Sequence, residues 1–178
     1  EKANKYFFFI RPRRFGKSLT LSMLRHYYDI NQTDKFDRLY GDLYIGKHPT
    51  PNHNKYLIIY LNFAVVNADL GNYRSALDAH CRTEFTILCD RYSSLLPSNL
   101  KENLMKEDGA VKQLDILYKV ANEVGLKIYL FIDEYDHFTN HILSDAARLD
   151  EYKGETHGTG YLRTFFDTIK AGTDSSIE

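Results

Sequence analysis

Three short stretches of the chain are continuously apolar and are typical of buried β-strands. They are Tyr6–Ile10 (YFFFI), Tyr56–Phe63 (YLIIYLNF) and Ile128–Ile132 (IYLFI). An alternating pattern would indicate a strand with one face in water, whereas a continuous run favours a strand that is covered on both faces. The pattern therefore predicts a parallel sheet that is covered by other elements on its two faces.

Two stretches between the predicted strands carry apolar residues at helical spacing. From Tyr73 to Tyr92 these residues recur at steps of three and four, and Pro97 follows the end of the pattern. A second helix is predicted over Ala110–Val124, with Gly125 placed to end it. Strands that alternate with helices predict an α/β architecture, in which ligands bind at the carboxyl ends of the strands.

The segment before the second predicted strand shows no such period. Residues 31–55 are polar and contain Pro49 and Pro51, so we predict an irregular connection there. Cys81 and Cys89 fall on the apolar side of the helix predicted after the second strand. This position favours core packing for both cysteines over a catalytic or metal-binding role.

The segment after the first predicted strand has the order of a phosphate-binding loop. It reads RPRRFGKS over residues 11–18 and leads into a helical run that begins at Leu19. In such a loop, backbone N–H groups at a helix N-terminus face an anion, a lysine adds full positive charge, and a hydroxyl ligates magnesium. Lys17 and Ser18 have the chemistry for the last two roles.

Two positions in this loop depart from the full phosphate-loop pattern. Arg11 stands where a first glycine is expected, and Pro12 has no N–H to offer a phosphate. The place of the Gly-Lys-Ser tripeptide, between a strand and a helix, still favours the phosphate loop over a chance match. Arg13 and Arg14 are either planar donors to phosphate oxygens or solvated loop charges, and the sequence does not distinguish the two.

Two acids, Asp133 and Glu134, directly follow the third predicted strand. In a mononucleotide-binding sheet the first acid holds magnesium, usually through water, and the second can polarise the attacking water. Asp133 is therefore a candidate metal residue and Glu134 a candidate general base. The alternative is that both are surface acids that cap the next helix. Because the loop and the acids follow two different strands at the same end, a single nucleotide site is the better interpretation.

Charge is unevenly distributed along the chain. Its 178 residues contain 23 Lys plus Arg and 24 Asp plus Glu, a net charge of −1 that excludes binding of nucleic acid or anionic lipid through an overall positive field. Residues 1–25, however, hold seven basic residues and one acid, whereas residues 133–178 hold four basic residues and ten acids. The near-neutral total hides a basic segment around the loop and an acidic segment around the two acids.

Cysteine content and hydropathy bear on the compartment. Two cysteines outside any Cys-x-x-Cys pair are too few for a disulfide-dense secreted scaffold, so we expect a reducing cytoplasm. The uninterrupted apolar runs, such as Tyr6–Ile10 and Tyr56–Leu61, are far shorter than the roughly 20 residues of a membrane-spanning helix, and no signal peptide precedes Tyr6–Ile10. Since the chain lacks an initiating Met and opens almost directly into an apolar run, we expect a fragment of a longer protein, and the resemblance described next implies that it is an N-terminal fragment.

The loop, the acidic pair and their surroundings resemble the bacterial AAA-ATPase-like family. The similar segments are RPRRFGKSLTLSML, YYDINQTDKFDRLYGDLYIGKHP, YLIIYLNF and IYLFIDEYD, within a similarity that runs from Tyr6 to about Gly172. Arginine in place of the first glycine is habitual in that family. The resemblance implies a single P-loop NTPase-type domain over residues 1–178, with a central parallel sheet that is incomplete on its C-terminal side. It also implies a PD-(D/E)XK nuclease-like domain farther along the full chain.

The loop pattern and the resemblance together assign residues to ATP and magnesium. The candidates are Arg13, Arg14, Phe15, Gly16, Lys17, Ser18 and Leu19 for the nucleotide, Ser18 and Asp133 for the metal, and Lys17 and Glu134 for catalysis. We expect a magnesium-dependent ATPase in which Glu134 activates water for attack on the γ-phosphoryl group. Three alternatives stay open: a switch that binds ATP with little hydrolysis and controls an attached effector, a nucleic-acid-binding module that uses the basic loop, and a small-molecule kinase.

Overall fold

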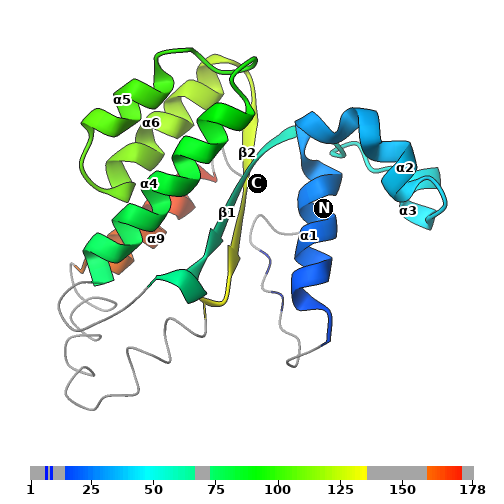
Figure 1. Ribbon diagram of the computed structural model, residues 1–178, viewed down its shortest axis with the longest axis horizontal. Helices are drawn as coiled ribbons and strands as arrows, with labels where there is room; N and C mark the ends of the chain where they lie inside the picture. Colours follow the sequence, from blue (N-terminus) through cyan, green and yellow to red (C-terminus); the bar gives the residue numbers. More distant parts are fainter. Residues whose placement is uncertain (1–6, 8, 10–14, 67–72, 136–159, 174–178) are drawn as a thin grey trace.

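The centre of the fold is a pair of parallel strands. The computed structural model describes residues 7, 9, 15–66, 73–135 and 160–173 (Figure 1). Strand β1 (Tyr56–Asn62) pairs with β2 (Lys127–Asp133) in parallel, with Tyr56 opposite Lys127 and Asn62 opposite Asp133. The second and third predicted strands are thus confirmed to within a residue at each end, and both end at the same edge of the sheet.

A series of helices connects the two strands. The short 3-10 helix η2 (Phe63–Val65) leaves β1 and is followed by α4 (Tyr73–Arg91), α5 (Leu100–Lys106) and α6 (Ala110–Glu123). These α-helices and α9 (Tyr161–Gly172) cover one face of the sheet (Figure 1). The two helices predicted between the strands are confirmed as α4 and α6. Cys81 and Cys89 are free, buried thiols in the core, as their spacing predicts.

Gly125 ends α6 as predicted. It has a φ of 70°, a left-handed conformation that a residue without a Cβ adopts at little cost. Its N–H donates to the carbonyl of Asn122 at 3.1 Å, and the N–H of Leu126 donates to the carbonyl of Ala121 at 2.9 Å. This paired C-terminal hydrogen bonding satisfies the last carbonyls of the helix and turns the chain toward β2.

Alternation along β1 and β2 separates two hydrophobic cores. Leu57, Ile59 and Leu61 belong to the larger core, which is formed with α4, α5, α6 and α9. Tyr56 and Ile58 instead contribute to a smaller, aromatic core on the opposite face. Because successive side chains of a strand point to opposite faces, the continuous apolar pattern of β1 corresponds to a strand that is covered on both sides.

The second face of the sheet is covered by α1 (Lys17–Tyr28) (Figure 1). It is followed by η1 (Ile30–Lys35), α2 (Phe36–Tyr40) and α3 (Tyr44–Lys47), so the prediction of an irregular connection over residues 31–55 is wrong for much of its length. The physical reason is aromatic packing, since the ring centroids of Phe36 and Tyr40 lie 5.7 and 5.5 Å from that of Tyr27. Side chains four residues apart on one turn anchor a helix that is too short to show a period.

The first predicted strand, Tyr6–Ile10, lies largely outside the described residues. Only Phe7 and Phe9 of this stretch are described; neither is in a strand, and Phe7 is 79% exposed. The sheet of the described residues has two strands, β1 and β2, and the prediction of a strand at Tyr6–Ile10 stays a prediction. Within the same ranges, none of the helices combines the length and apolar character that crossing a membrane requires.

Candidate functional site

The site begins at the N-terminus of α1. Gly16 has a φ of 74° and precedes the 12-residue helix, and its carbonyl accepts the N–H of Thr20 at 2.9 Å. A Cβ at Gly16 would meet no described atom within 4 Å, so it is the left-handed backbone that favours glycine here. No side chain caps this end of the helix in the described part of the chain, and its first turn carries no acid. The helix end thus presents backbone N–H groups and a positive dipole to an anion.

The structure brings Lys17 together with both predicted acids. The start of α1 and the end of β2 lie at the same end of the molecule (Figure 1). The Lys17 Nζ is 3.1 Å from Oδ1 of Asp133 and 3.0 Å from Oε1 of Glu134. The side chain of Asp133 is 4% exposed, whereas those of Lys17 and Glu134 are 25% and 36% exposed. Asp133 is therefore the buried member of the cluster, and Lys17 and Glu134 are reached by solvent. Helix α1 and strand β2, far apart in sequence, together form one charged cluster.

The two carboxylates decide the protonation of Lys17. Partial burial by itself lowers the pKa of this lysine, but hydrogen bonds to Glu134 and Asp133 and their negative charges raise it, and the net result is a raised pKa. An opposite charge at hydrogen-bond distance favours the ionised form of a lysine. The cluster therefore holds a permanent ammonium group between its two acids at neutral pH.

The backbone at Glu134 has an unusual conformation. Glu134 has a φ of 55°, in the left-handed region that non-glycine residues seldom occupy. Its N–H donates to Oδ1 of the preceding Asp133 at 2.9 Å. Such conformations cost roughly 1–3 kcal/mol and persist where surrounding contacts hold them, commonly at functional sites. The turn coincides with the contact between Glu134 and Lys17.

Tyr60 belongs to the site although it was absent from the sequence-based candidates. Its hydroxyl donates to Oδ2 of Asp133 at 3.0 Å, across from β1 to β2. The guanidinium carbon of Arg25, from α1, lies 4.0 Å from the centre of the Tyr60 ring. The sequence signal that could have identified Tyr60 is a hydroxyl group two residues before the carboxyl end of a mostly aliphatic strand.

A magnesium ion that is shared with a phosphate requires few ligands from the protein. Mg²⁺ usually keeps several waters and binds one or two carboxylates together with phosphate oxygens, so it needs no cage made only of protein groups. Among the described residues, no group of three or more His, Cys, Asp or Glu could hold a metal ion. The single buried carboxylate of Asp133 matches the shared type of site, and the exposed Ser18 offers a hydroxyl in the first turn of α1.

The structure describes only some of the remaining residues that were predicted to bind the nucleotide. Phe15 and Leu19 are 67% and 68% exposed around the start of α1. Arg13 and Arg14 lie outside the described residues, so their two interpretations stay open. The predicted residues that the structure joins by contacts are Lys17, Asp133 and Glu134.

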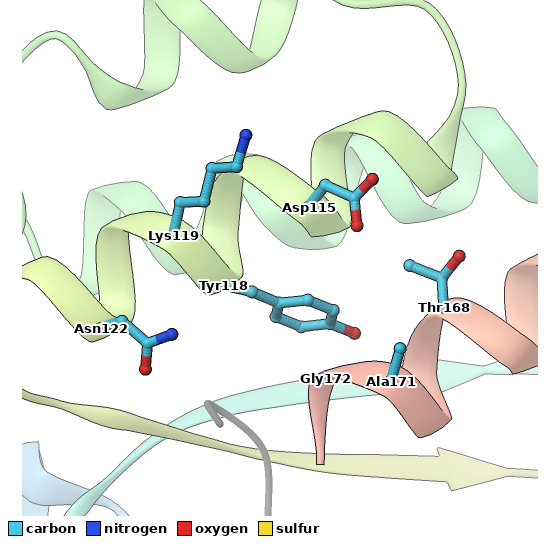
Figure 2. Close-up of a pocket in the computed structure, with 7 residues that line it drawn as sticks. All are labelled: Asp115, Tyr118, Lys119, Asn122, Thr168, Ala171 and Gly172. Carbon is cyan, nitrogen blue, oxygen red and sulfur yellow. The ribbon is translucent and has the colours of Figure 1, made fainter. Parts of the chain in front are cut away.

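A cavity elsewhere in the fold contains none of the predicted residues. Its volume is about 260 Å³, and it lies between α6 and α9 (Figure 2). Its lining consists of Asp115, Tyr118, Lys119, Asn122, Thr168, Ala171 and Gly172. These helices cover the opposite face of the sheet from α1, so this cavity is separate from the Lys17 cluster.

Comparisons with known proteins identify a family. Neither the curated proteins nor the solved structures contain a match to this chain. The model of the AAA-ATPase-like family, described as predicted AAA-ATPase, matches residues 1–178. This match extends over the loop, both strands and the acidic pair. The chain therefore belongs to the AAA-ATPase-like family.

Proposed function

We propose that this chain binds ATP with magnesium where the start of α1 meets the end of β2. We propose further that it hydrolyses the phosphoanhydride bond between the β- and γ-phosphates. The observation that carries the proposal is the contact of Lys17 with both Asp133 and Glu134, at 3.1 and 3.0 Å. A lysine at a glycine-led helix N-terminus and two acids at a strand end are the parts that phosphoryl transfer requires. Membership in an ATPase-like family supports nucleotide binding in general.

Each part has a separate role in the proposed reaction. The backbone N–H groups at the start of α1 and the Lys17 ammonium bind the phosphates, and Arg13 and Arg14 are proposed to add further charge. Ser18 and Asp133 would hold Mg²⁺, which neutralises phosphate charge when bound. Glu134 would accept a proton from the water that attacks the γ-phosphorus, while the bond from this phosphorus to the bridging oxygen of the β-phosphate breaks and ADP leaves. Positioning and electrostatics account for most of the catalysis in such a reaction.

The same contacts favour a second candidate, a nucleotide-controlled switch. Lys17 forms ion pairs with both Asp133 and Glu134. A triphosphate that draws the ammonium group away would release both carboxylates at once. Binding alone would thereby change the edge of the sheet, and an attached effector, such as a C-terminal nuclease-like domain, could respond without rapid hydrolysis.

Replacement of Lys17 tests nucleotide binding. Lys17→Ala removes the only described side-chain cation within contact distance of both acids, so affinity for a fluorescent ATP analogue should fall at least about tenfold. Lys127→Ala is the matched control, because Lys127 is an exposed lysine at the opposite end of β2. Equal affinity of wild type and Lys17→Ala for the ATP analogue would show that the nucleotide does not bind at this edge of the sheet.

Replacement of Glu134 separates the ATPase from the switch. Glu134→Gln keeps the shape of the side chain but removes the base, so ATP should still bind while turnover falls about a hundredfold or more. Glu123→Gln, in the last turn of α6, is the control. If wild-type protein binds ATP but turns over no faster than Glu134→Gln, the switch is the better description.

A further inference from the structure

The buried carboxylate of Asp133 is held through both of its oxygens. Oδ1 accepts the N–H of Glu134 at 2.9 Å and lies 3.1 Å from the Lys17 Nζ. Oδ2 accepts the hydroxyl of Tyr60 at 3.0 Å. The two oxygens therefore have different surroundings. Oδ1 belongs to the charged cluster, and Oδ2 faces the neighbouring strand.

The sheet register makes this hydrogen bond possible. Asn62 lies opposite Asp133 and Tyr60 lies opposite Phe131, so Tyr60 is one step back on the same face of the sheet. Diagonal neighbours of this kind are within reach of a long aromatic side chain. The hydroxyl of Tyr60 thus reaches Asp133 from the neighbouring strand β1, whereas Lys17 reaches it from α1.

We infer that Tyr60 is a positioning residue that fixes the Asp133 carboxylate, with Oδ2 held by the tyrosine and Oδ1 turned toward the metal and phosphate position. This inference rests on the proposed function. A carboxylate that is already oriented loses less rotational freedom when it binds a cation. Removal of the hydroxyl should therefore weaken metal binding and leave the nucleotide contacts of α1 intact.

The surroundings of Tyr60 keep its hydroxyl a hydrogen-bond donor. Burial, together with the hydrogen bond to Asp133, raises the pKa of Tyr60 to about 12. A phenol is protonated in the neutral range even at its ordinary pKa, and the 3.0 Å contact with Oδ2 of Asp133 is that of a hydroxyl donor with a carboxylate acceptor. The Arg25 guanidinium, 4.0 Å from the ring centre, packs on the tyrosine and limits its movement.

The test compares metal-dependent with metal-independent nucleotide binding in Tyr60→Phe. This variant keeps the ring and its contact with Arg25 and removes one oxygen atom. Binding of a fluorescent ATP analogue is measured at increasing Mg²⁺ and, separately, in EDTA. The Mg²⁺ concentration for half-maximal binding should rise about tenfold, the usual loss for a hydrogen bond to a charged group, while affinity in EDTA stays unchanged.

Tyr129→Phe is the matched control, since Tyr129 lies on the same face of the sheet, on β2, among the residues packed against the aromatic core. Its Mg²⁺ dependence should equal that of wild type. An unchanged Mg²⁺ dependence in Tyr60→Phe would overturn the inference and leave the nucleotide site standing. Loss of binding both with Mg²⁺ and in EDTA would overturn it too, because it would make Tyr60 a structural residue. Wild-type protein that binds no nucleotide in either condition would instead refute the proposed function, and with it this role of Tyr60.

Discussion

Protonation distinguishes two residues near the carboxyl edge of the sheet, Lys17 and His80. Lys17 is kept charged by its two acids, whereas burial lowers the pKa of His80 on α4. Nε2 of His80 accepts the backbone N–H of Asn62, the last residue of β1, at 3.1 Å. A protonated imidazole has no acceptor nitrogen, so this contact requires neutral His80.

The His80 contact predicts a loss of stability in weak acid. Because its pKa is lowered in the folded state, His80 stays neutral there at a pH where the histidine of the unfolded chain, below about pH 6.5, takes up a proton. The contribution of His80 to folding stability is therefore complete above that pH and declines as the pH falls through it. The free energy of unfolding should drop by up to about 1.4 kcal/mol per pH unit from this group. His80→Gln, whose amide oxygen can accept the same N–H, should lose less.

Urea unfolding at about pH 7.5 and about pH 5.5 measures this difference. Replacement of a surface histidine, His48→Gln, controls for general acid effects, because His48 lies in an exposed position just after α3. Identical pH dependence in wild type and His80→Gln would show that another group titrates.

Three elements are joined by one buried acid at the amino-terminal side of the sheet. Asp29 directly follows α1 and is 1% exposed. Its Oδ1 accepts the Tyr92 hydroxyl at 2.9 Å, and its Oδ2 lies 2.7 Å from Nη2 of Arg91, at the end of α4. The oxygen of Tyr92 also accepts the N–H of Ile58 in β1 at 3.0 Å. The packing of α1, α4 and β1 therefore depends on a single polar network.

Loss of the Tyr92 hydroxyl should destabilise the fold. Tyr92→Phe leaves the buried N–H of Ile58 without its acceptor and Asp29 without one donor, so the free energy of unfolding should fall by about 1–3 kcal/mol. Tyr44→Phe is the control, because Tyr44 is 80% exposed and its replacement should change stability by less than about 0.5 kcal/mol. Urea unfolding of both variants provides the measurement. A stability loss in Tyr92→Phe no larger than in the control would mean that water replaces the network.

At the scale of the molecule, the described residues form two hydrophobic cores on opposite faces of a narrow sheet. The larger core contains both cysteines, and the smaller, aromatic core supports α1 and with it Lys17. Lys17, from the basic segment, contacts Asp133 and Glu134, from the acidic segment, so these three described residues form a local ion cluster.

The reactivity of the two buried thiols measures how often the larger core opens to solvent. Burial raises the pKa of Cys81, and it raises the pKa of Cys89 to about 11, so neither thiol is a reactive thiolate in the folded protein. Both should react with iodoacetamide only through opening of the core, more than about a hundredfold slower than in urea. Mass spectrometry of time points assigns the labelled residue. Rapid native labelling of Cys81 would contradict a closed core around α4.

Within the larger core, β1, β2, α4 and α6 were predictable because their signals are local, whereas α5 and α9 were not predicted from the pattern. The apolar runs of β1 and β2, the period of α4 and α6, and Gly125 are all visible within a few residues. The short helices α2 and α3 were missed, because five and four residues do not establish a period and the contacts of Phe36 and Tyr40 with Tyr27 hold this region together.

The sequence by itself determined which chemical groups the site contains: Lys17 after a glycine at a helix start, and Asp133 and Glu134 after a strand. Only the tertiary structure decided that the ammonium group lies between both acids and that Tyr60 holds the far oxygen of Asp133. The physical reason is that these contacts depend on the pairing register of β1 with β2 and on the packing of α1 against them. Both arise between segments far apart in the chain, where no local pattern specifies which side chains meet.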